Sequence, residues 1–243
     1  MNIKILNSIA VIIAALFAVA TINAQEAKTM YVMKKGAVIF QHTVSDIDSI
    51  IFYEPSIDPT DPLTSDAGVV INGVKWATRN VDKPGAFTAT PEDPGMFYQW
   101  NSKVGWSAID PLKPSDGTSV WNNSWNGNNA TTWEKANDPC PPGWRMPSQG
   151  ELNALISSGY VWKTVNSMNG MQFGSGSNTL FLPAAGYRFY DGTLYDAGSD
   201  GYYWSSTADD APYSYYLYFT AGIAYVYWYD YRANGLSCRC VAE

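Results

Sequence analysis

The sequence predicts an α+β fold in which one or two helices accompany antiparallel sheets. Aromatic residues make up 15% of the 243 residues, and the chain contains 20 Gly and 14 Pro; this composition favours short strands and turns over long helices. One strong helix signal lies in the middle of the chain, and the residues after Thr179 alternate between strand-forming runs and turns. We therefore expect a β-rich protein with a late antiparallel sheet.

The N-terminal region predicts an export signal. Lys4 precedes an apolar run at residues 9–20, and small and polar residues follow as far as Ala24, an order typical of a secretory signal peptide of residues 1–24. The run is short and no basic cluster follows it, which disfavours a retained membrane anchor. We expect an exported mature chain with no membrane span, located in the periplasm, at the cell surface or outside the cell.

Two short regions are expected before the main domain. Residues 30–33 and 37–41 flank a Lys-Lys-Gly turn and predict a hairpin, and residues 44–53 should end in a third short strand. Residues 25–55 would thus form a small β module. Residues 56–67 contain two Asp-Pro steps and predict an extended linker, which places the larger domain at residues 68–243.

Local motifs predict the strands of the larger domain. Asn72-Gly73 separates two short apolar runs, which is a strong hairpin signal. The remaining expected strands are residues 180–182, 186–190, 202–206, 215–219, 224–229 and 237–241.

The predicted helix begins after Ser148. Ser148 and Glu151 have the spacing of a capping box, in which each side chain bonds the backbone amide of the other residue. Leu152, Leu155 and Ile156 then fall on one face, and Gly159 ends the helix.

Composition and motifs disfavour several functional classes. The formal net charge of −7 repels phosphate backbones, so no nucleic-acid partner is expected. His42 is the only histidine, so metal or hydrolase chemistry would lack imidazole in most of the chain. No nucleophile elbow, metalloprotease helix motif or phosphate loop is present. We expect a protein that is not an enzyme and uses no cofactor or metal.

Three cysteines in an exported chain imply one disulfide and one remaining thiol. Cys140 is one partner, because Cys238 and Cys240 are two residues apart and point to the same face of a strand. The residues alone leave the choice between Cys238 and Cys240 open. Either bridge closes a loop of about 100 residues, worth roughly 4.7 kcal/mol in the chain-entropy treatment.

Six sequence blocks follow one another between residues 73 and 241. They are GVKWATRN at 73–80, FYQW at 97–100, DPCPPGWRMP at 138–147, LPAAGYR at 182–188, YWSST at 203–207 and RCV at 239–241. Together they resemble the Fibrobacter succinogenes major paralogous domain, over residues 68–243. The resemblance implies a C-type-lectin-like fold with a disulfide between the helical region and the last strand. It also places the terminal cysteine of the family at Cys240, which implies a Cys140–Cys240 bridge and a free Cys238.

The calcium-binding motifs of lectins with that fold are not present in this sequence. The nearest segment, Trp121-Asn122-Asn123, lacks the carboxylate that such a motif supplies. Any sugar binding is therefore expected to be independent of calcium.

Tyrosine is concentrated near the C-terminus, where 13 of the 17 tyrosines lie between residues 187 and 231. Strand alternation places Leu217 and Phe219 on one face and Tyr216 and Tyr218 on the other. Tyrosine offers a binding site a large, stiff contact surface with a hydroxyl group. The same pattern also fits a strand that is buried on both faces, or a sheet whose outer face is in water, because tyrosine is a good strand residue. We predict a ligand-binding surface that comprises Tyr216, Tyr218, Tyr225, Tyr227, Tyr229, Asp230, Tyr231 and Asn234.

The leading hypothesis is an exported recognition or adhesion protein whose ligand is a protein or glycan on a cell surface. The same segment resembles the variable tip of lectin-fold receptors that retroelements diversify; the scaffold positions would be Leu217, Phe219, Val226, Arg232, Gly235, Arg239 and Cys240, and Trp228 does not fit the substitution pattern. One alternative is a calcium-independent glycan binder that uses Trp121, Trp125 and Trp133. Another is a structural subunit of a surface appendage.

Overall fold

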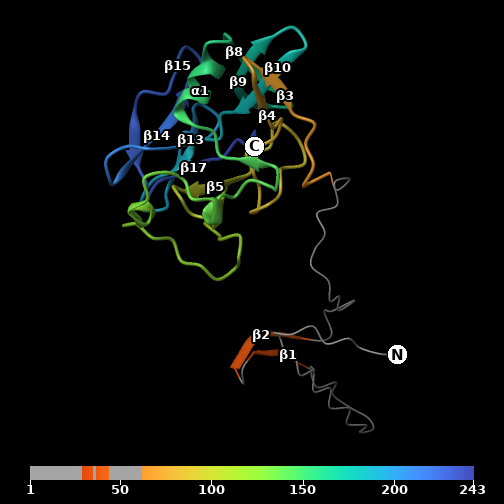
Figure 1. Cartoon of the computed structure of the whole chain (residues 1–243), viewed down its shortest axis with the longest axis vertical. Coiled ribbons are helices and arrows are strands. Elements are labelled where there is room, and N and C mark those ends of the chain that lie inside the picture. The colour runs from red at the N-terminus through yellow and green to blue at the C-terminus, as the bar shows by residue number, and fades with distance from the viewer. Residues whose placement is uncertain (1–28, 35–36, 44–61) are drawn as a thin grey trace. The chain divides into compact units, whose positions relative to one another are not determined.

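The computed structural model describes residues 29–34, 37–43 and 62–243 (Figure 1). The chain divides into two compact units, Met1–Ser56 and Ile57–Glu243. In the first unit, β1 (Thr29–Lys34) and β2 (Ala37–Thr43) pair antiparallel, which confirms the predicted hairpin. The predicted signal peptide, the third strand expected within residues 44–53 and residues 56–61 of the predicted linker lie outside the described residues.

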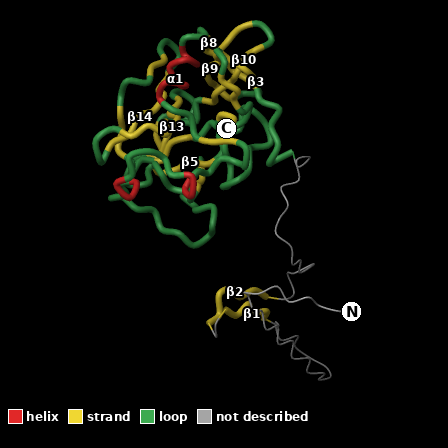
Figure 2. The backbone as a smooth tube through the Cα atoms, in the orientation of Figure 1, coloured by secondary structure: helices red, strands yellow, loops and turns green. Residues whose placement is uncertain are grey.

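The large unit is mostly β, with one short α-helix in its described part (Figure 2). This agrees with the predicted α+β class at the level of secondary structure. A four-stranded sheet has the order β3-β4-β18-β7, and a three-stranded sheet has the order β10-β9-β8. Their strands are β3 (Val69–Ile71), β4 (Val74–Trp76), β7 (Trp144–Arg145), β8 (Tyr160–Val165), β9 (Met168–Ser175), β10 (Asn178–Pro183) and β18 (Val241–Ala242).

A nine-stranded sheet forms the largest part of the unit. Its main path is β12-β11-β17-β13-β14-β15, with β16 paired to β14 and with β5 paired to β17 and β6. The pairs are antiparallel except for β13 with β17, which is parallel. The strands are β5 (Met96–Gln99), β6 (Gly105–Ser107), β11 (Tyr187–Arg188), β12 (Leu194–Tyr195), β13 (Gly201–Ala208), β14 (Tyr213–Phe219), β15 (Ala224–Tyr225), β16 (Tyr229–Tyr231) and β17 (Gly235–Ser237).

The elements with complete local signals form as predicted. Asn72 and Gly73 turn the chain between β3 and β4 with φ of 49° and 82°. Helix α1 (Gln149–Ile156) has a capping box, in which the Ser148 amide donates to Glu151 Oε2 at 2.7 Å and the Glu151 amide donates to Ser148 Oγ at 3.3 Å. Arg145 also donates to Glu151, at 2.6 Å, and so fixes the carboxylate at the start of the helix.

Two strands that were expected to be continuous are interrupted, and one hairpin was missed. Residues 237–241 do not form one strand, because β17 ends at Ser237 and β18 begins at Val241. Residues 224–229 do not form one strand, because β15 ends at Tyr225 and β16 begins at Tyr229. Between them Val226 is fully buried and anchors the bend to the core. The β8–β9 hairpin was not predicted, since most side chains of β8 are half-buried or exposed and show no apolar alternation.

The central strands β13 and β14 pack against core on both faces. On one face Leu217 and Phe219 belong to a cluster with the buried helix residues Leu152 and Leu155. On the other face Trp204 and Tyr216 belong to a second cluster, which contains the cysteines. Burial of both faces stabilises the fold, because the hydrophobic free energy scales with the apolar area removed from water.

The disulfide joins Cys140 to Cys240, as the family resemblance implies, with a sequence separation of 100 residues. It connects the segment before α1 to the residue that precedes β18. Cys238 is a free thiol and is fully buried, and burial raises its pKa. The thiol is therefore protonated at neutral pH and packs as a small apolar group.

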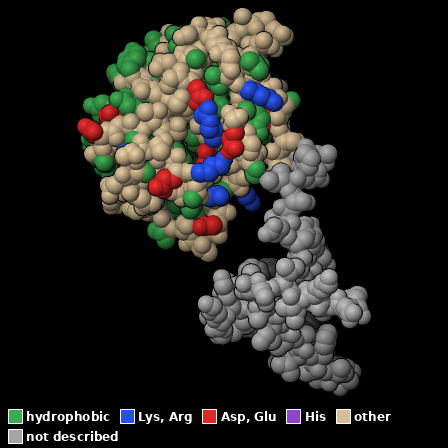
Figure 3. Space-filling model, in the orientation of Figure 1, with side chains coloured by type: hydrophobic (Ala, Val, Ile, Leu, Met, Phe, Trp, Pro, Cys, Tyr) green, Lys and Arg blue, Asp and Glu red, His purple; other side chains and the backbone are tan. Residues whose placement is uncertain are grey.

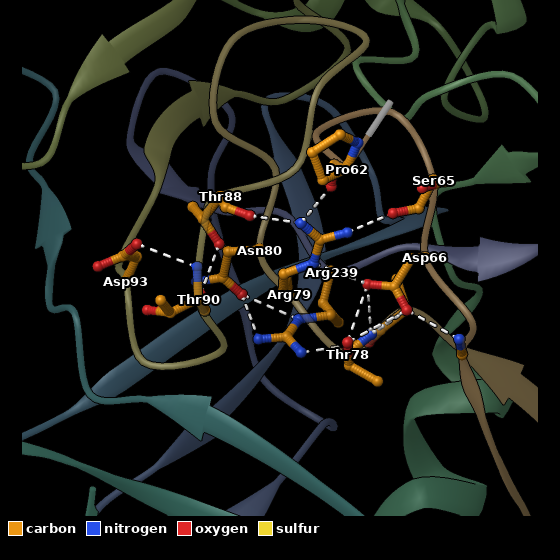
Figure 4. A network of polar contacts seen from close by, with 12 residues as sticks. Pro62, Ser65, Asp66, Thr78, Arg79, Asn80, Thr88, Thr90, Asp93 and Arg239 are labelled. Atoms are coloured by element: carbon orange, nitrogen blue, oxygen red, sulfur yellow. Dashed lines mark hydrogen bonds and ion pairs between the residues drawn. The ribbon is translucent and has the colours of Figure 1, made fainter. Parts of the chain in front are cut away.

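A buried polar network holds the start of the large unit (Figure 4). Arg79 pairs with Asp66 at 3.2 Å and also donates to the carbonyl oxygens of Pro62 and Ser65. Nearby, Arg239 donates to Asn80 Oδ1 at 2.7 and 2.9 Å, and burial lowers its pKa to about 10. Among the described residues, Pro62, Ser65 and Asp66 thus make folded contacts although they lie inside the segment expected to be a linker.

Replacing Glu151 with Gln should cost stability in a pH-dependent way. Burial alone raises the pKa of this carboxyl, but hydrogen bonds from Arg145 and Ser148 outweigh burial and hold the pKa below its ordinary value of 4.5. As the pH falls, the carboxyl group is therefore protonated in the unfolded chain before it is protonated in the folded one. The stabilisation is complete above the pKa of the unfolded state and is lost as the pH falls through the lower pKa of the folded state. We expect E151Q to lower the free energy of unfolding by about 1 kcal/mol at pH 7, and by much less at pH 3, in urea titrations. An equal loss at both pH values would contradict the charge argument.

Removing the disulfide should destabilise the large unit strongly. The Cys140→Ala/Cys240→Ala variant is expected to lose about 2–5 kcal/mol of unfolding free energy, because the open loop restores entropy to the unfolded chain. Cys238→Ala is the control, since it keeps the bridge. Non-reducing peptide mapping should recover the 140–240 crosslink, and a crosslink to Cys238 would show that the pairing is wrong.

Candidate functional site

Exposed aromatic side chains gather on the strands and loops after Arg188. The exposed fractions are 69% for Tyr227, 56% for Trp228, 54% for Tyr229 and 45% for Tyr231. Tyr190 and Tyr195 are also more than two-fifths exposed. Because clusters of exposed apolar side chains are enriched at interaction sites, these residues form the candidate site.

The predicted row from Tyr225 to Tyr231 divides into two groups, because Tyr225 pairs with the end of β14 and Tyr229 and Tyr231 pair with its beginning. Tyr225 and Tyr227 stack with ring centroids 4.8 Å apart, and Tyr225 also contacts Tyr218. Tyr229 instead faces Tyr213, at 5.1 Å, across the β14–β16 pair. The change from β15 to β16 therefore separates side chains that a single continuous strand would have aligned.

The first group continues along β13 and β11, and we call it the aromatic track. Its members in ring contact are Tyr187, Tyr202, Tyr218, Tyr225, Tyr227 and Trp228. The Tyr202 hydroxyl donates to Asp196 at 2.8 Å, and the Tyr218 hydroxyl donates to Asp200 at 2.6 Å. These hydrogen bonds fix two carboxylates beside the rings.

The second group, which we call the tyrosine cluster, comprises Tyr213, Tyr215, Tyr229 and Tyr231. The hydroxyls of Tyr213 and Tyr231 lie 3.2 Å apart, and Tyr215 donates to Asp209 at 2.9 Å. The bond to Asp209, together with burial, raises the pKa of Tyr215. Both hydroxyl arrangements stiffen the exposed end of β14 and β16.

The structure brings most of the predicted site residues to these two groups, but two of them are buried. Tyr216 is only 6% exposed, because its ring packs over Tyr202 and Trp204 in the core. Asn234 is 1% exposed. Asp230 is half-buried, and burial raises the pKa of its carboxyl. The prediction that Tyr216 and Asn234 contribute to an exposed surface was therefore wrong, since alternation assigns a face without showing whether that face is covered.

An open groove with a volume of about 410 Å³ lies beside the tyrosine cluster. Tyr231, Trp125 and Tyr190 line it together with Asn123, Ser124, Pro212 and Ala233. None of these lining residues carries a charge at neutral pH. Tyr190 was not predicted to belong to a site. Trp121 Nε1 donates to its carbonyl oxygen at 2.6 Å, a long-range contact that no local pattern indicates.

The tryptophans of the predicted glycan site have separate roles. Trp133 is 6% exposed and its ring contacts Trp100, so it belongs to the core and is not available to stack on a sugar. Trp121 is half-buried against Trp106. Trp125 donates from Nε1 to the Trp100 carbonyl at 2.7 Å, and this bond positions its ring at the groove.

Neither metal nor membrane features are found in the described ranges. Among those residues, no group of three or more His, Cys, Asp or Glu side chains is placed to bind a metal ion. Within the same ranges, none of the helices has the length and hydrophobicity that crossing a bilayer requires.

Residues 161–241 match a domain of unknown function, DUF8237. The matched segment runs from β8 into β18 and contains both the aromatic track and the tyrosine cluster. No curated protein and no solved structure shows significant similarity to the chain.

Proposed function

We propose that this protein is an exported, non-catalytic recognition or adhesion protein that binds a macromolecular ligand on a cell surface through its C-terminal aromatic residues. The observation that carries the proposal is the exposed run Tyr227, Trp228 and Tyr229, each more than half exposed, on a bend that Val226 anchors in the core. Rigid aromatic side chains on an anchored loop give contact area at a low entropic cost, as in antibody paratopes.

The same proposal assigns residues 68–243 to the Fibrobacter succinogenes major paralogous domain, with a C-type-lectin-like fold. The Cys140–Cys240 bridge supports this assignment, because it connects the region before the helix to the final strand. The burial of Leu217, Val226 and Arg232 beside exposed tyrosines also supports the hypothesis of a constant scaffold with a diversified tip.

Changing Tyr227 and Tyr229 together to Ala should abolish ligand binding with little effect on the fold. Both rings are mainly in water, so the expected loss of unfolding free energy is about 1 kcal/mol. Binding is measured by capture of surface-extract components on immobilised protein, compared by quantitative proteomics with wild type. Tyr160→Ala, an exposed tyrosine on β8, is the matched control and should retain capture.

Leu217→Ala provides the opposite case. This side chain is fully buried, so truncation should cost about 2–5 kcal/mol in thermal or urea unfolding. If the tyrosine double variant captured the same components as wild type, the recognition surface would be rejected.

The groove supports a second candidate function, which is calcium-independent glycan binding. Aromatic walls and the neutral polar side chains of Asn123 and Ser124 suit a sugar, whose faces are apolar and whose hydroxyls need hydrogen-bond partners. On a glycan array, Tyr190→Ala and Asn123→Ala should each reduce binding at least fivefold if this function is correct. Added chelator should change nothing, and Tyr160→Ala is again the control. Signals that persist in both groove variants would rule the groove out.

A further inference from the structure

The segment that carries most of the aromatic track is acidic, and within the described part of the chain none of its aspartates forms an ion pair with Lys or Arg. Residues 189–231 contain no Lys, Arg, His or Glu; their six charged residues are Asp191, Asp196, Asp200, Asp209, Asp210 and Asp230. The two flanking arginines, Arg188 and Arg232, are each 1% exposed and donate to backbone carbonyls inside the fold. Figure 3 shows the Lys and Arg side chains of the visible face in a band with Asp and Glu, over the region around the C-terminus.

Two of these carboxylates are built into the aromatic track. Tyr202 and Tyr218 lie 5.1 Å apart, centroid to centroid, and their hydroxyls hold Asp196 and Asp200. Burial, followed by the bond to Asp200, raises the pKa of Tyr218, so its hydroxyl remains protonated and keeps donating. Each tyrosine uses one oxygen of its carboxylate, which leaves the second oxygen to accept from a bound molecule.

The far end of the track supplies exposed ring faces. Tyr218 contacts Tyr225 at 5.1 Å, and Tyr225 contacts Tyr227 at 4.8 Å and Trp228 at 4.9 Å. The track thus offers stacked aromatic faces at one end and fixed carboxylates at the other. A guanidinium group uses both features, since it stacks on aromatic rings and forms paired hydrogen bonds with carboxylates.

We propose that the aromatic track binds an arginine-containing, positively charged segment of a protein partner. This inference rests on the proposed recognition function and names the chemistry of its ligand. Charge complementarity selects this occupant, because phosphate-rich ligands are repelled and a neutral glycan would leave the carboxylates without a counter-charge.

The direct test uses a fluorescently labelled peptide of alternating Arg and Gly, with fluorescence anisotropy on the full chain. The same peptide with citrulline in place of arginine keeps the shape and loses the charge. We expect the citrulline peptide to bind at least tenfold more weakly, and we expect binding of the arginine peptide to weaken as NaCl is raised from 50 to about 300 mM. Equal binding of the two peptides would overturn the proposal.

Local variants separate a defined site from general attraction to an acidic protein. Asp196→Asn/Asp200→Asn keeps an acceptor for each tyrosine hydroxyl and should lower affinity for the arginine peptide at least tenfold. Glu92→Gln/Asp116→Asn removes two charges outside residues 189–231 and should leave affinity within twofold of wild type. If both double variants lost affinity equally, net charge alone would explain binding and the proposed site would be overturned.

Trp228→Ala tests stacking and leaves the carboxylates unchanged. The fold should tolerate this change, because the Trp228 side chain is 56% exposed. It should weaken arginine-peptide binding severalfold, and unchanged affinity would count against stacking at this end. If surface-extract capture needs Tyr227 and Tyr229 but the arginine peptide does not bind, the proposed function stands and this inference fails. Glycan binding that is lost in Asp196→Asn/Asp200→Asn would reject the inference in favour of a sugar ligand.

Discussion

Three arginine side chains inside the large unit hold together segments that secondary structure does not. Arg188, Arg232 and Arg239 are each 1% exposed, and most of their hydrogen bonds go to backbone carbonyl groups in loops or at strand ends. Carbonyl groups buried without partners would cost free energy, and so would a guanidinium group buried without acceptors. Each arginine meets both needs at once, because its guanidinium group donates to several of these carbonyl groups. The loops therefore depend on these side chains for their positions.

Arg232 shows how this arrangement reaches the exposed aromatic side chains. It directly follows Tyr231, stacks 4.3 Å from the Trp100 ring, and donates to the carbonyls of Asn126 and Ala130 in the tryptophan-rich loop. Through Nε it also bonds the Tyr213 carbonyl at the start of β14. One side chain thus fixes the tyrosine cluster and the loop that carries Trp125. Contacts that are positioned in this way need little ordering when a ligand binds, which favours affinity.

The sequence predicted elements whose signals are local. The Asn72-Gly73 turn and the capping box at Ser148 depend on a few adjacent residues, and the structure contains both. Burial depends on what other segments place over a face. Alternation correctly separated Tyr216 from Leu217, yet both are buried, because a second cluster around the disulfide covers the tyrosine face. The acidic partners of the tyrosine hydroxyls were missed for the same reason, since Asp196 and Asp200 reach the rings only after the sheet has formed.

Tyrosine rather than phenylalanine suits this sheet because of its hydroxyl. A ring of either type would fill the space between β13, β14 and β15, but only the hydroxyl extends past the apolar layer to bond Asp196, Asp200 and Asp209. The rings therefore take part in core packing while their polar ends orient carboxylates at the surface. The same tyrosine side chains therefore contribute to the stability of the core and fix the positions of the surface carboxylates. Tyr227 and Trp228 lie beyond this layer and are more than half exposed, so we expect their replacement to leave the core intact.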